Sequence, residues 1–345
     1  MYKIAKEKLP SLFAAVAAQM DLYLPVKKNG QVNYGIWSKE EEIALDALTT
    51  VTSPKDIFFP QSETLYNCCL EEKKLTIAPE AVNETPFALF GIRACDAEGL
   101  KVLDQVFLSD PIDTYYQARR EHGILIAMAC HQPEETCFCR VFGVKAQEPA
   151  GDIVTWMIDH TLFWEPKTEK GSELTERLIE HLSLAEYGAE EIVKKEQENI
   201  GNLVEKLPYS HLSLEVFRQE KLINLFQSPV WDELYKTCLG CGVCTFICPT
   251  CQCYDIQDYP SGNTIRRFRC WDSCMYSEFT LMAHGNIRNT QKERFRQRFM
   301  HKLVYFPENN NGMFSCVGCG RCMKKCPSHL NIIKVIKRLG VSEDV

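Results

Sequence analysis

The sequence predicts a three-part fold: an α/β N-terminal domain in residues 1–170, a helical connector in residues 171–228, and an α+β C-terminal domain in residues 229–345. Three observations lead to this prediction. Short apolar runs bounded by helical patterns occupy the first part, a charged helical pattern covers the second, and two copies of one cysteine motif lie in the third. Continuous apolar runs are typical of parallel strands buried on both faces. A chain of 345 residues is long enough for two or three domains.

The first domain is expected to contain both helices and strands. Apolar residues at helical spacing predict helices at Ser11–Met20, Ala97–Phe107 and Asp113–Arg120. Short apolar runs predict strands at Leu22–Val26, Asp56–Phe59, Phe87–Ile92 and Ile124–Ala129. The last two runs are bounded by helical patterns, so we expect them to be buried parallel strands. Asp96 follows the first of these two strands and is interpreted as the cap of the helix that it begins.

The remaining segments are expected to be mostly helical. The connector should contain charged helices at Ser172–Leu182 and Ala189–Lys206, and their polar faces are interpreted as solvated. A short helix at Ile332–Leu339 should pack on the C-terminal domain. Residues 249–315 form a long insert between the two cysteine motifs, and we expect this insert to have structure of its own.

The C-terminal domain carries the motif C-x2-C-x2-C-x3-C-P twice. This is the spacing of ferredoxins with two [4Fe–4S] clusters, in which the fourth cysteine of each motif ligates the other cluster. The predicted ligands of the first cluster are Cys238, Cys241, Cys244 and Cys326. Those of the second cluster are Cys316, Cys319, Cys322 and Cys248. Zinc sites also use C-x2-C, but zinc explains neither the third and fourth cysteines nor the proline that follows them.

Four further cysteines lie just past two predicted strands, at Cys95, Cys130, Cys137 and Cys139. Ligands bind at this edge of open α/β sheets. If the two strands are neighbours, all four sulfurs can converge and hold a third [4Fe–4S] cluster. Alternatively, Cys95 and Cys130 are small buried apolar residues, which is a common role of free cysteine.

Six of the eighteen cysteines remain, at Cys68, Cys69, Cys251, Cys253, Cys270 and Cys274. The members near the first motif could form a fourth cluster or a redox-active thiol pair. We favour thiols that are packed around the cluster pocket. The adjacent pair Cys68 and Cys69 is interpreted as structural.

Charge and motifs restrict the classes of function. The net charge of −7 argues against a nucleic-acid partner, and the chain has neither an apolar run of membrane-spanning length nor a glycine-rich nucleotide motif. No acid–base constellation is found, because the histidines are isolated, at His131, His160, His284 and His301. The insert is basic, with Arg266, Arg267, Arg269, Arg288, Lys292, Arg294, Arg296, Arg298 and Lys302. We interpret this patch as a solvated surface or as a docking face for an acidic partner.

Several segments together resemble the dicluster-ferredoxin family that contains the beta subunit of cytoplasmic sulfhydrogenases and the A subunit of anaerobic sulfite reductase. The similarity covers roughly Phe59–Ile332, in the segments Gly91–Asp96 (GIRACD), Tyr115–Arg120, Cys130–Cys139 (CHQPEETCFC), Cys238–Cys253 (CLGCGVCTFICPTCQC), Cys270–Cys274 (CWDSC), Arg294–Lys302 (RFRQRFMHK) and Cys316–Pro327 (CVGCGRCMKKCP). The resemblance implies a third cluster at Cys95, Cys130, Cys137 and Cys139. Cys270 replaces an arginine that is usual in the family, which argues against a fourth cluster that uses it.

The resemblance implies an electron-carrying subunit with no catalytic residues of its own. It would relay electrons between a flavoprotein that binds FAD and NAD(P)H and a catalytic subunit, such as a sulfite reductase or a hydrogenase. Iron–sulfur ligands must stay reduced, so we expect a cytoplasmic and anaerobic setting. The alternatives are a stand-alone iron–sulfur reductase with its own substrate site and an oxygen-sensing regulatory module. The sequence does not identify the catalytic partner.

Overall fold

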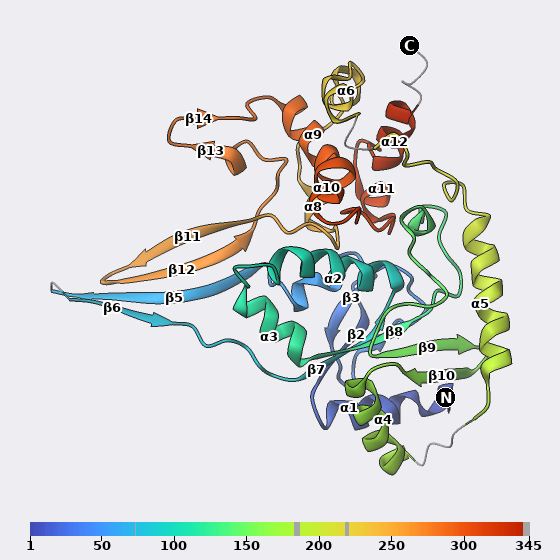
Figure 1. Cartoon of the computed structure of the whole chain (residues 1–345). Helices are drawn as coiled ribbons and strands as arrows, with labels where there is room; N and C mark the ends of the chain where they lie inside the picture. The colour runs from blue at the N-terminus through green and yellow to red at the C-terminus, as the bar shows by residue number, and fades with distance from the viewer. Residues whose placement is uncertain (73, 183–186, 218–220, 341–345) are drawn as a thin grey trace.

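A mixed sheet forms the N-terminal half of the computed structural model, which describes residues 1–72, 74–182, 187–217 and 221–340 (Figure 1). Within these ranges its strands are β1 (Tyr2–Ala5), β2 (Asp21–Lys28), β3 (Gln31–Ile36), β4 (Glu42–Ile43), β7 (Phe87–Ile92), β8 (Gly123–Met128), β9 (Ile153–Ile158) and β10 (Thr161–Pro166). They lie in the order β1-β10-β9-β8-β7-β2-β3, and β4 pairs with β2. The central strands β2, β7, β8 and β9 are parallel, whereas the outer pairings are antiparallel.

Helices cover both faces of this sheet. One face packs against α1 (Leu9–Ala17) and α4 (Glu169–Leu182), and the other against α2 (Ala94–Phe107) and α3 (Thr114–His122). Alternate side chains of β7 point to opposite faces: Phe90 contacts Phe13 of α1, and Leu89 belongs to the core with α2. All residues of β7 and β8 are therefore buried, as the apolar runs predicted.

A second sheet projects from the body as an arm (Figure 1). Its strands, all antiparallel, are β11 (Tyr254–Ser261), β12 (Thr264–Trp271), β5 (Ser62–Glu71) and β6 (Lys74–Pro79), in this order. Two strands come from the N-terminal half and two from the insert, so the sheet joins distant parts of the chain. Every residue of β6 and β11 is exposed.

The C-terminal part is mainly helical. Its helices are α5 (Glu190–Glu205), α6 (Leu222–Gln227), α7 (Trp231–Leu234), α8 (Val243–Phe246), α9 (Gln291–Met300), α10 (Phe306–Asn309), α11 (Arg321–Lys325) and α12 (Ile332–Gly340). A π-helical turn, His301–Tyr305, joins α9 to α10. A small hairpin, β13 (Leu281–Met282) and β14 (Gly285–Asn286), precedes α9. Side chains of α7, α9 and α12 share one apolar core, which includes Trp231, Phe295 and Ile336.

The mixed α/β architecture of the N-terminal half is confirmed, but two local predictions change. The first helix begins earlier than predicted, at Leu9, because Pro10 occupies its first turn. The predicted strand Asp56–Phe59 is wrong, since the chain forms a 3-10 turn at Pro54–Ile57. Its apolar residues are buried by packing instead of strand pairing: Phe58 contacts Phe87, and Phe59 contacts Trp271.

The two connector helices, whose polar faces are expected to be solvated, each bury an apolar face. Leu174 and Leu178 of α4 pack beneath the sheet with α1, and Val193 and Ile200 of α5 pack in the cluster that contains Trp156. Amphipathic helices bury an apolar stripe in this way. The domain limits proposed from the sequence stay a prediction.

Candidate metal centre

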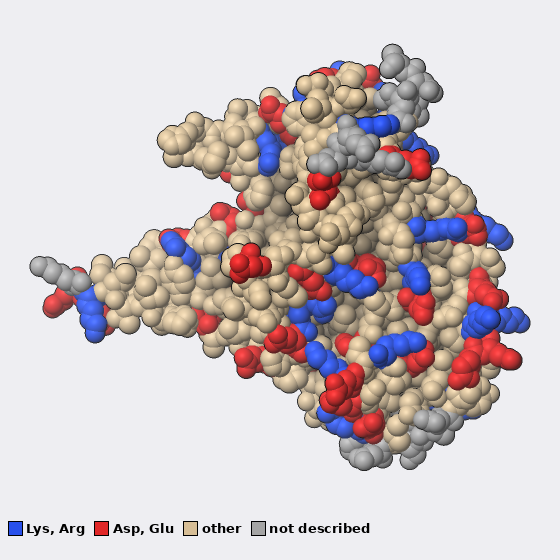
Figure 2. All heavy atoms as spheres, in the orientation of Figure 1, with Lys and Arg blue, Asp and Glu red and all other residues tan. Residues whose placement is uncertain are grey.

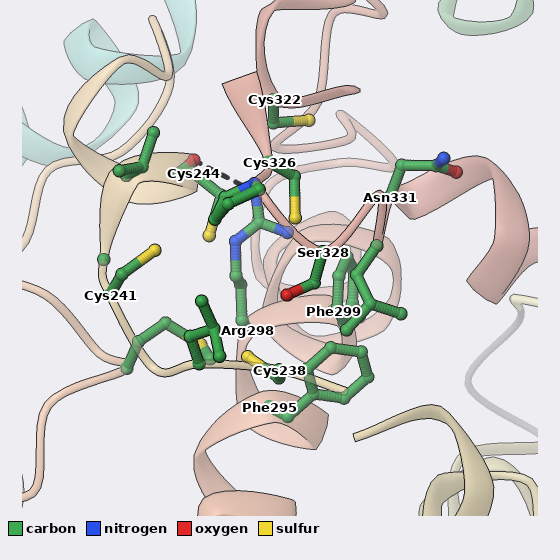
Figure 3. A pocket seen from close by; sticks show the side chains of 16 residues that line it. Cys238, Cys241, Cys244, Phe295, Arg298, Phe299, Cys322, Cys326, Ser328 and Asn331 are labelled. Atoms are coloured by element: carbon green, nitrogen blue, oxygen red, sulfur yellow. Dashed lines mark hydrogen bonds between the residues drawn. The ribbon is translucent and has the colours of Figure 1, made fainter. Parts of the chain in front are cut away.

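A first cavity in the C-terminal helical part is ringed by cysteines (Figure 3). Its lining includes Cys238, Cys241, Cys244, Cys322 and Cys326. Cys238 and Cys241 come from the segment that leads into α8, Cys244 lies in α8, and α11 ends at Cys326. The structure thus brings together the four residues predicted to hold the first cluster. Burial raises the pKa of the Cys244 thiol to about 11.

A second cavity gathers the other predicted set, and its lining includes Cys248, Cys316, Cys319 and Cys322. Cys248 follows α8, Cys316 and Cys319 belong to the segment that leads into α11, and Cys322 lies in α11. Burial raises the pKa of Cys316 to about 12, so its thiolate requires a nearby positive charge. Bound iron supplies such a charge and deprotonates a coordinating thiol.

Tight loops support both cavities, and their glycines are required by geometry. Gly242, which caps α8, has φ of +73°, and an added Cβ would lie 2.7 Å from the hydroxyl oxygen of Tyr276. Gly318 has φ of +63°, and its Cβ would lie 2.5 Å from the backbone of Phe138. Within the described ranges, no three His, Cys, Asp or Glu side chains converge on a point that one metal ion could occupy. The cysteines surround cavities, which is the arrangement that a four-iron cluster needs.

The third predicted group also comes together, at the edge of the first sheet. Cys95 begins α2 after β7, and Cys130 follows β8, which is the parallel neighbour of β7. Burial is the main cause that raises the pKa of Cys137 to about 11 and that of Cys139 to about 12, and the charge of Cys130 adds to both effects. Burial is also the largest cause that raises the pKa of Cys95, and the charge of Cys130 adds to this effect. Cys130 therefore lies among the other three.

A buried ion pair links this group to the second cavity. Arg321 of α11 donates to both carboxylate oxygens of Asp96 at 2.6 and 2.7 Å, and both side chains are 2% exposed. The interpretation of Asp96 as a helix cap is wrong, because Arg93 occupies the cap position and the Asp96 carboxylate turns to Arg321. A buried guanidinium without a counter-charge would be strongly unfavourable, which explains the pairing.

The basic patch predicted in the insert is largely dispersed. Arg269, Arg298 and Lys302 are buried, so they cannot form a docking face. Figure 2 shows Lys and Arg side chains interspersed with Asp and Glu on the face drawn. Arg298 lines both cavities, and Lys302 lines the second. Burial alone would lower the pKa of Lys302, but the negative charges of Cys248 and Cys251 raise it.

Sequence reasoning missed Arg298 and Lys302 as parts of the site, although a signal was present. Phe295, Arg298 and Phe299 share one helical face, which continues to Lys302 and Leu303. In an amphipathic helix, basic residues within the apolar stripe point to the interior. Positively charged residues on such a stripe require a buried counter-charge.

The remaining cysteines fall into two places. Cys251 and Cys253 lie beside the second cavity, and Cys253 and Cys274 form a hydrogen bond that raises the pKa of Cys274. The others belong to the arm: Cys68 and Cys69 are on β5, and Cys270 is on β12. Cys270 pairs with Asp255 and Ser62 in the ladder.

Comparison with known proteins agrees with this geometry. Residues 237–330 match the model of the 4Fe-4S dicluster domain. The chain is 30% identical over 349 positions to the sulfhydrogenase 2 subunit beta of Pyrococcus furiosus, and the match covers 97% of this chain and 96% of that protein. The chain belongs to the sulfhydrogenase beta-subunit family. The similarity extends beyond the segment Phe59–Ile332 that the motifs indicated.

Membership of the sulfhydrogenase beta-subunit family and the dicluster domain support an iron–sulfur electron-transfer subunit of an oxidoreductase, with [4Fe–4S] clusters as its cofactors. In the described part of the chain, no helix combines the length and the apolar character needed to cross a membrane.

Proposed function

We propose that this chain relays electrons through three [4Fe–4S] clusters. Cluster one would be held by Cys238, Cys241, Cys244 and Cys326. Cluster two would be held by Cys248, Cys316, Cys319 and Cys322. Cluster three would be held by Cys95, Cys130, Cys137 and Cys139. One observation carries the proposal for clusters one and two: each cavity gathers three cysteines of one motif and the fourth cysteine of the other, and Cys322 lines the first cavity as well.

The three sites are arranged in series, with cluster two in the middle. Cys322 and Arg298 line the cavities of both cluster one and cluster two. On the other side, Cys319 packs in the same buried group as Cys95 and Cys139. Adjacent sites thus share walls, and short gaps favour electron transfer between clusters.

Both ends of this series lie near the surface. Cys241 of cluster one is exposed, and the side chain of the neighbouring Leu239 is 71% exposed. At the other end, Cys130 and Cys137 are partly exposed. Access at two ends suits a carrier that receives electrons from one partner and delivers them to another.

The partners we propose are a flavoprotein that binds FAD and NAD(P)H and a catalytic oxidoreductase subunit, assembled in the cytoplasm of an anaerobe. The relative from Pyrococcus furiosus is, by its name, one subunit of a sulfhydrogenase. The arm offers a surface for assembly, because Leu75 and Ile77 of β6 lie beside Leu70 and Cys68 of β5 on one exposed face. Figure 2 shows this arm largely free of charge on the face drawn. Contiguous exposed apolar surface commonly marks a protein interface.

Metal analysis of the anaerobically reconstituted chain and of two variants tests the proposal. Wild type should contain about twelve iron and about twelve acid-labile sulfide per chain. Cys137→Ser should lower the iron content by about four, through loss of cluster three. Cys248→Ser should perturb the cluster otherwise held by Cys316, Cys319 and Cys322, as shown by selective labelling and electron paramagnetic resonance (EPR). Cys68→Ser, in the arm, is the matched control and should retain all the iron.

Two results would contradict parts of this proposal. If wild type saturates at about eight iron per chain, the proposal of cluster three is contradicted, whereas the other two clusters remain supported. Spectroscopic evidence that Cys244 and Cys248 ligate the same cluster would contradict the proposal that the fourth cysteine of each motif ligates the other cluster.

A further inference from the structure

Lys302 is a buried lysine whose three hydrogen-bond donors are all directed at the cluster two site. Its side chain is 3% exposed. The Nζ atom donates to Thr250 Oγ1 at 2.7 Å, to the Ser315 carbonyl oxygen at 2.8 Å and to Cys248 Sγ at 3.4 Å. An ammonium group has three donors, so its hydrogen-bonding capacity is used entirely at this site.

Arg298 lies one helical turn before Lys302 and reaches the same region. Its side chain is 4% exposed, and its guanidinium donates to the Cys244 carbonyl oxygen at 3.1 Å. Its Nε atom has no hydrogen-bond partner within the described part of the protein. Figure 3 shows this guanidinium between the cysteines of the first cavity.

No carboxylate balances these two cations among the described residues. Two other buried cations differ: Arg321 pairs with Asp96, and Arg269 pairs with Glu63 and Asp113. Buried Lys55 and Arg93 instead donate to backbone carbonyl oxygens. Arg298 and Lys302 differ from Lys55 and Arg93 because they line the cysteine cavities, where a bound anion would offset the cost of their buried charge. A cubane held by four thiolates is a net anion in both of its oxidation states, and it would serve as this anion.

The backbone is shaped to place Lys302 at this position. The residue lies in the π-helical turn His301–Tyr305, which interrupts the regular hydrogen bonding between α9 and α10. Such turns insert an extra residue into a helix and occur frequently at functional sites. The side chain of Lys302 reaches Thr250 in the loop that follows Cys248.

We infer that Lys302, with Arg298 beside it, is a positioning residue that supplies the fixed counter-charge of cluster two and raises its reduction potential. Reduction adds one negative charge to the cluster, so a nearby cation stabilises the reduced form more than the oxidised form. A hydrogen bond to the ligand sulfur acts in the same direction. The inference rests on the proposed function, because it requires a cluster in the second cavity.

This arrangement gives the middle site of the relay a distinct role. A raised potential makes cluster two the preferred location of an electron that enters from either end. The relay would then hold one electron in a buried position while the partners at its ends exchange.

The test is an EPR-monitored redox titration of the full chain, reconstituted anaerobically. The signal of cluster two is first identified as the one that Cys248→Ser perturbs. Lys302→Gln should disfavour its reduced form on the order of tenfold, which corresponds to a potential lowered by about 59 mV for a one-electron couple. Lys302→Arg keeps the charge and should restore a potential close to that of wild type. Lys292→Gln, at a partly exposed lysine of α9 that pairs with Asp232, is the matched control and should change nothing.

Each outcome decides the inference. A full iron content with an unchanged or raised potential in Lys302→Gln would overturn it. If Lys302→Gln loses cluster two, Lys302→Arg decides: retention of the cluster supports the role of charge, and loss in both variants would show a packing role and overturn the inference. Absence of iron–sulfur signals in wild type would instead count against the proposed function.

Discussion

Single residues in this protein take their roles from burial more than from residue type. Arg267 and Arg269 lie on the same strand, β12, and both pair with carboxylates. The side chain of Arg267 is 41% exposed, whereas that of Arg269 is 3% exposed and sits between two acidic residues. Composition alone places both in one basic patch, because the sequence does not reveal which face of β12 the body covers.

His301, next to Lys302, should make stability depend on pH. Burial, together with the charges of Lys302 and Arg288, lowers its pKa from 6.5 to about 4. Because the unfolded chain binds the proton more readily, its stabilising contribution is complete above pH 6.5 and is lost as the pH falls toward 4. Between pH 7.5 and 5.5 wild type should lose about 1.4 kcal/mol of unfolding free energy through this group.

Urea unfolding followed by tryptophan fluorescence at both pH values measures this effect. His301→Phe keeps the edge contact with the ring of Phe306 and cannot titrate, so it should lack this part of the pH dependence. His284→Phe, at an exposed residue, is the control and should behave as wild type does. Equal pH dependence in wild type and His301→Phe would contradict the argument.

The elements divide into those that the sequence specifies locally and those that depend on distant partners. Strands β7 and β8 are buried on both faces, so their apolar runs identify them. Strands β6 and β11 are exposed on both faces and therefore lack any periodic burial pattern. The hairpin of β9 and β10 also went unpredicted, although Asp159, with φ of +50°, is a residue type that favours its tight turn.

The loop that leads into α11 should be sensitive to one methyl group. Gly318→Ala combines an unfavourable backbone conformation with a Cβ placed 2.5 Å from the backbone of Phe138. The amide of Phe138 donates to the carbonyl oxygen of Gly318 at 2.9 Å, so the two segments cannot separate without losing this bond. We expect a loss of about 2 kcal/mol or more in unfolding free energy and reduced loading of cluster two.

Gly262→Ala is the matched control for this variant. Gly262 has φ of +61°, but an added Cβ would meet no atom within 4 Å. The unfolding free energy lost in Gly262→Ala therefore reports the backbone conformation alone. The difference between the losses of the two variants reports the contact with Phe138. Iron analysis and urea unfolding of both proteins measure that difference; equal losses would mean that the contact is unimportant.

At the scale of the whole molecule, residues far apart in sequence build the structure together. The indole of Trp271 donates to the carbonyl oxygen of Phe59 at 3.0 Å, and Lys55 donates to that of Cys251 at 2.8 Å. Spacing alone predicted which cysteines gather at each cavity, because cluster chemistry dictates short local motifs. It did not predict the buried cations around them, since their positions depend on contacts between the two halves.

Because the halves interlock, the full chain should unfold in one cooperative transition. Arg269→Met would leave Glu63 and Asp113 facing each other without the cation between them, and we expect a loss of about 3 kcal/mol. Both circular dichroism and cluster absorbance should shift together. Arg267→Met removes an exposed pair on the same strand and should have little effect. Separate transitions for the two probes would show that the halves fold independently.

The sharing of each cavity between two distant segments also constrains the biogenesis of the protein. The ribosome releases Cys238, Cys241 and Cys244 well before Cys326, the last residue that the first cavity needs. The second cavity is also completed late, because Cys248 is synthesised well before the segment that begins at Cys316. A nascent chain that ends within the insert would thus present both half-sites open to solvent. With the proposed ligands, neither site can be completed before Cys322 and Cys326 have been synthesised, and a premature stop before residue 322 would remove ligands of both at once.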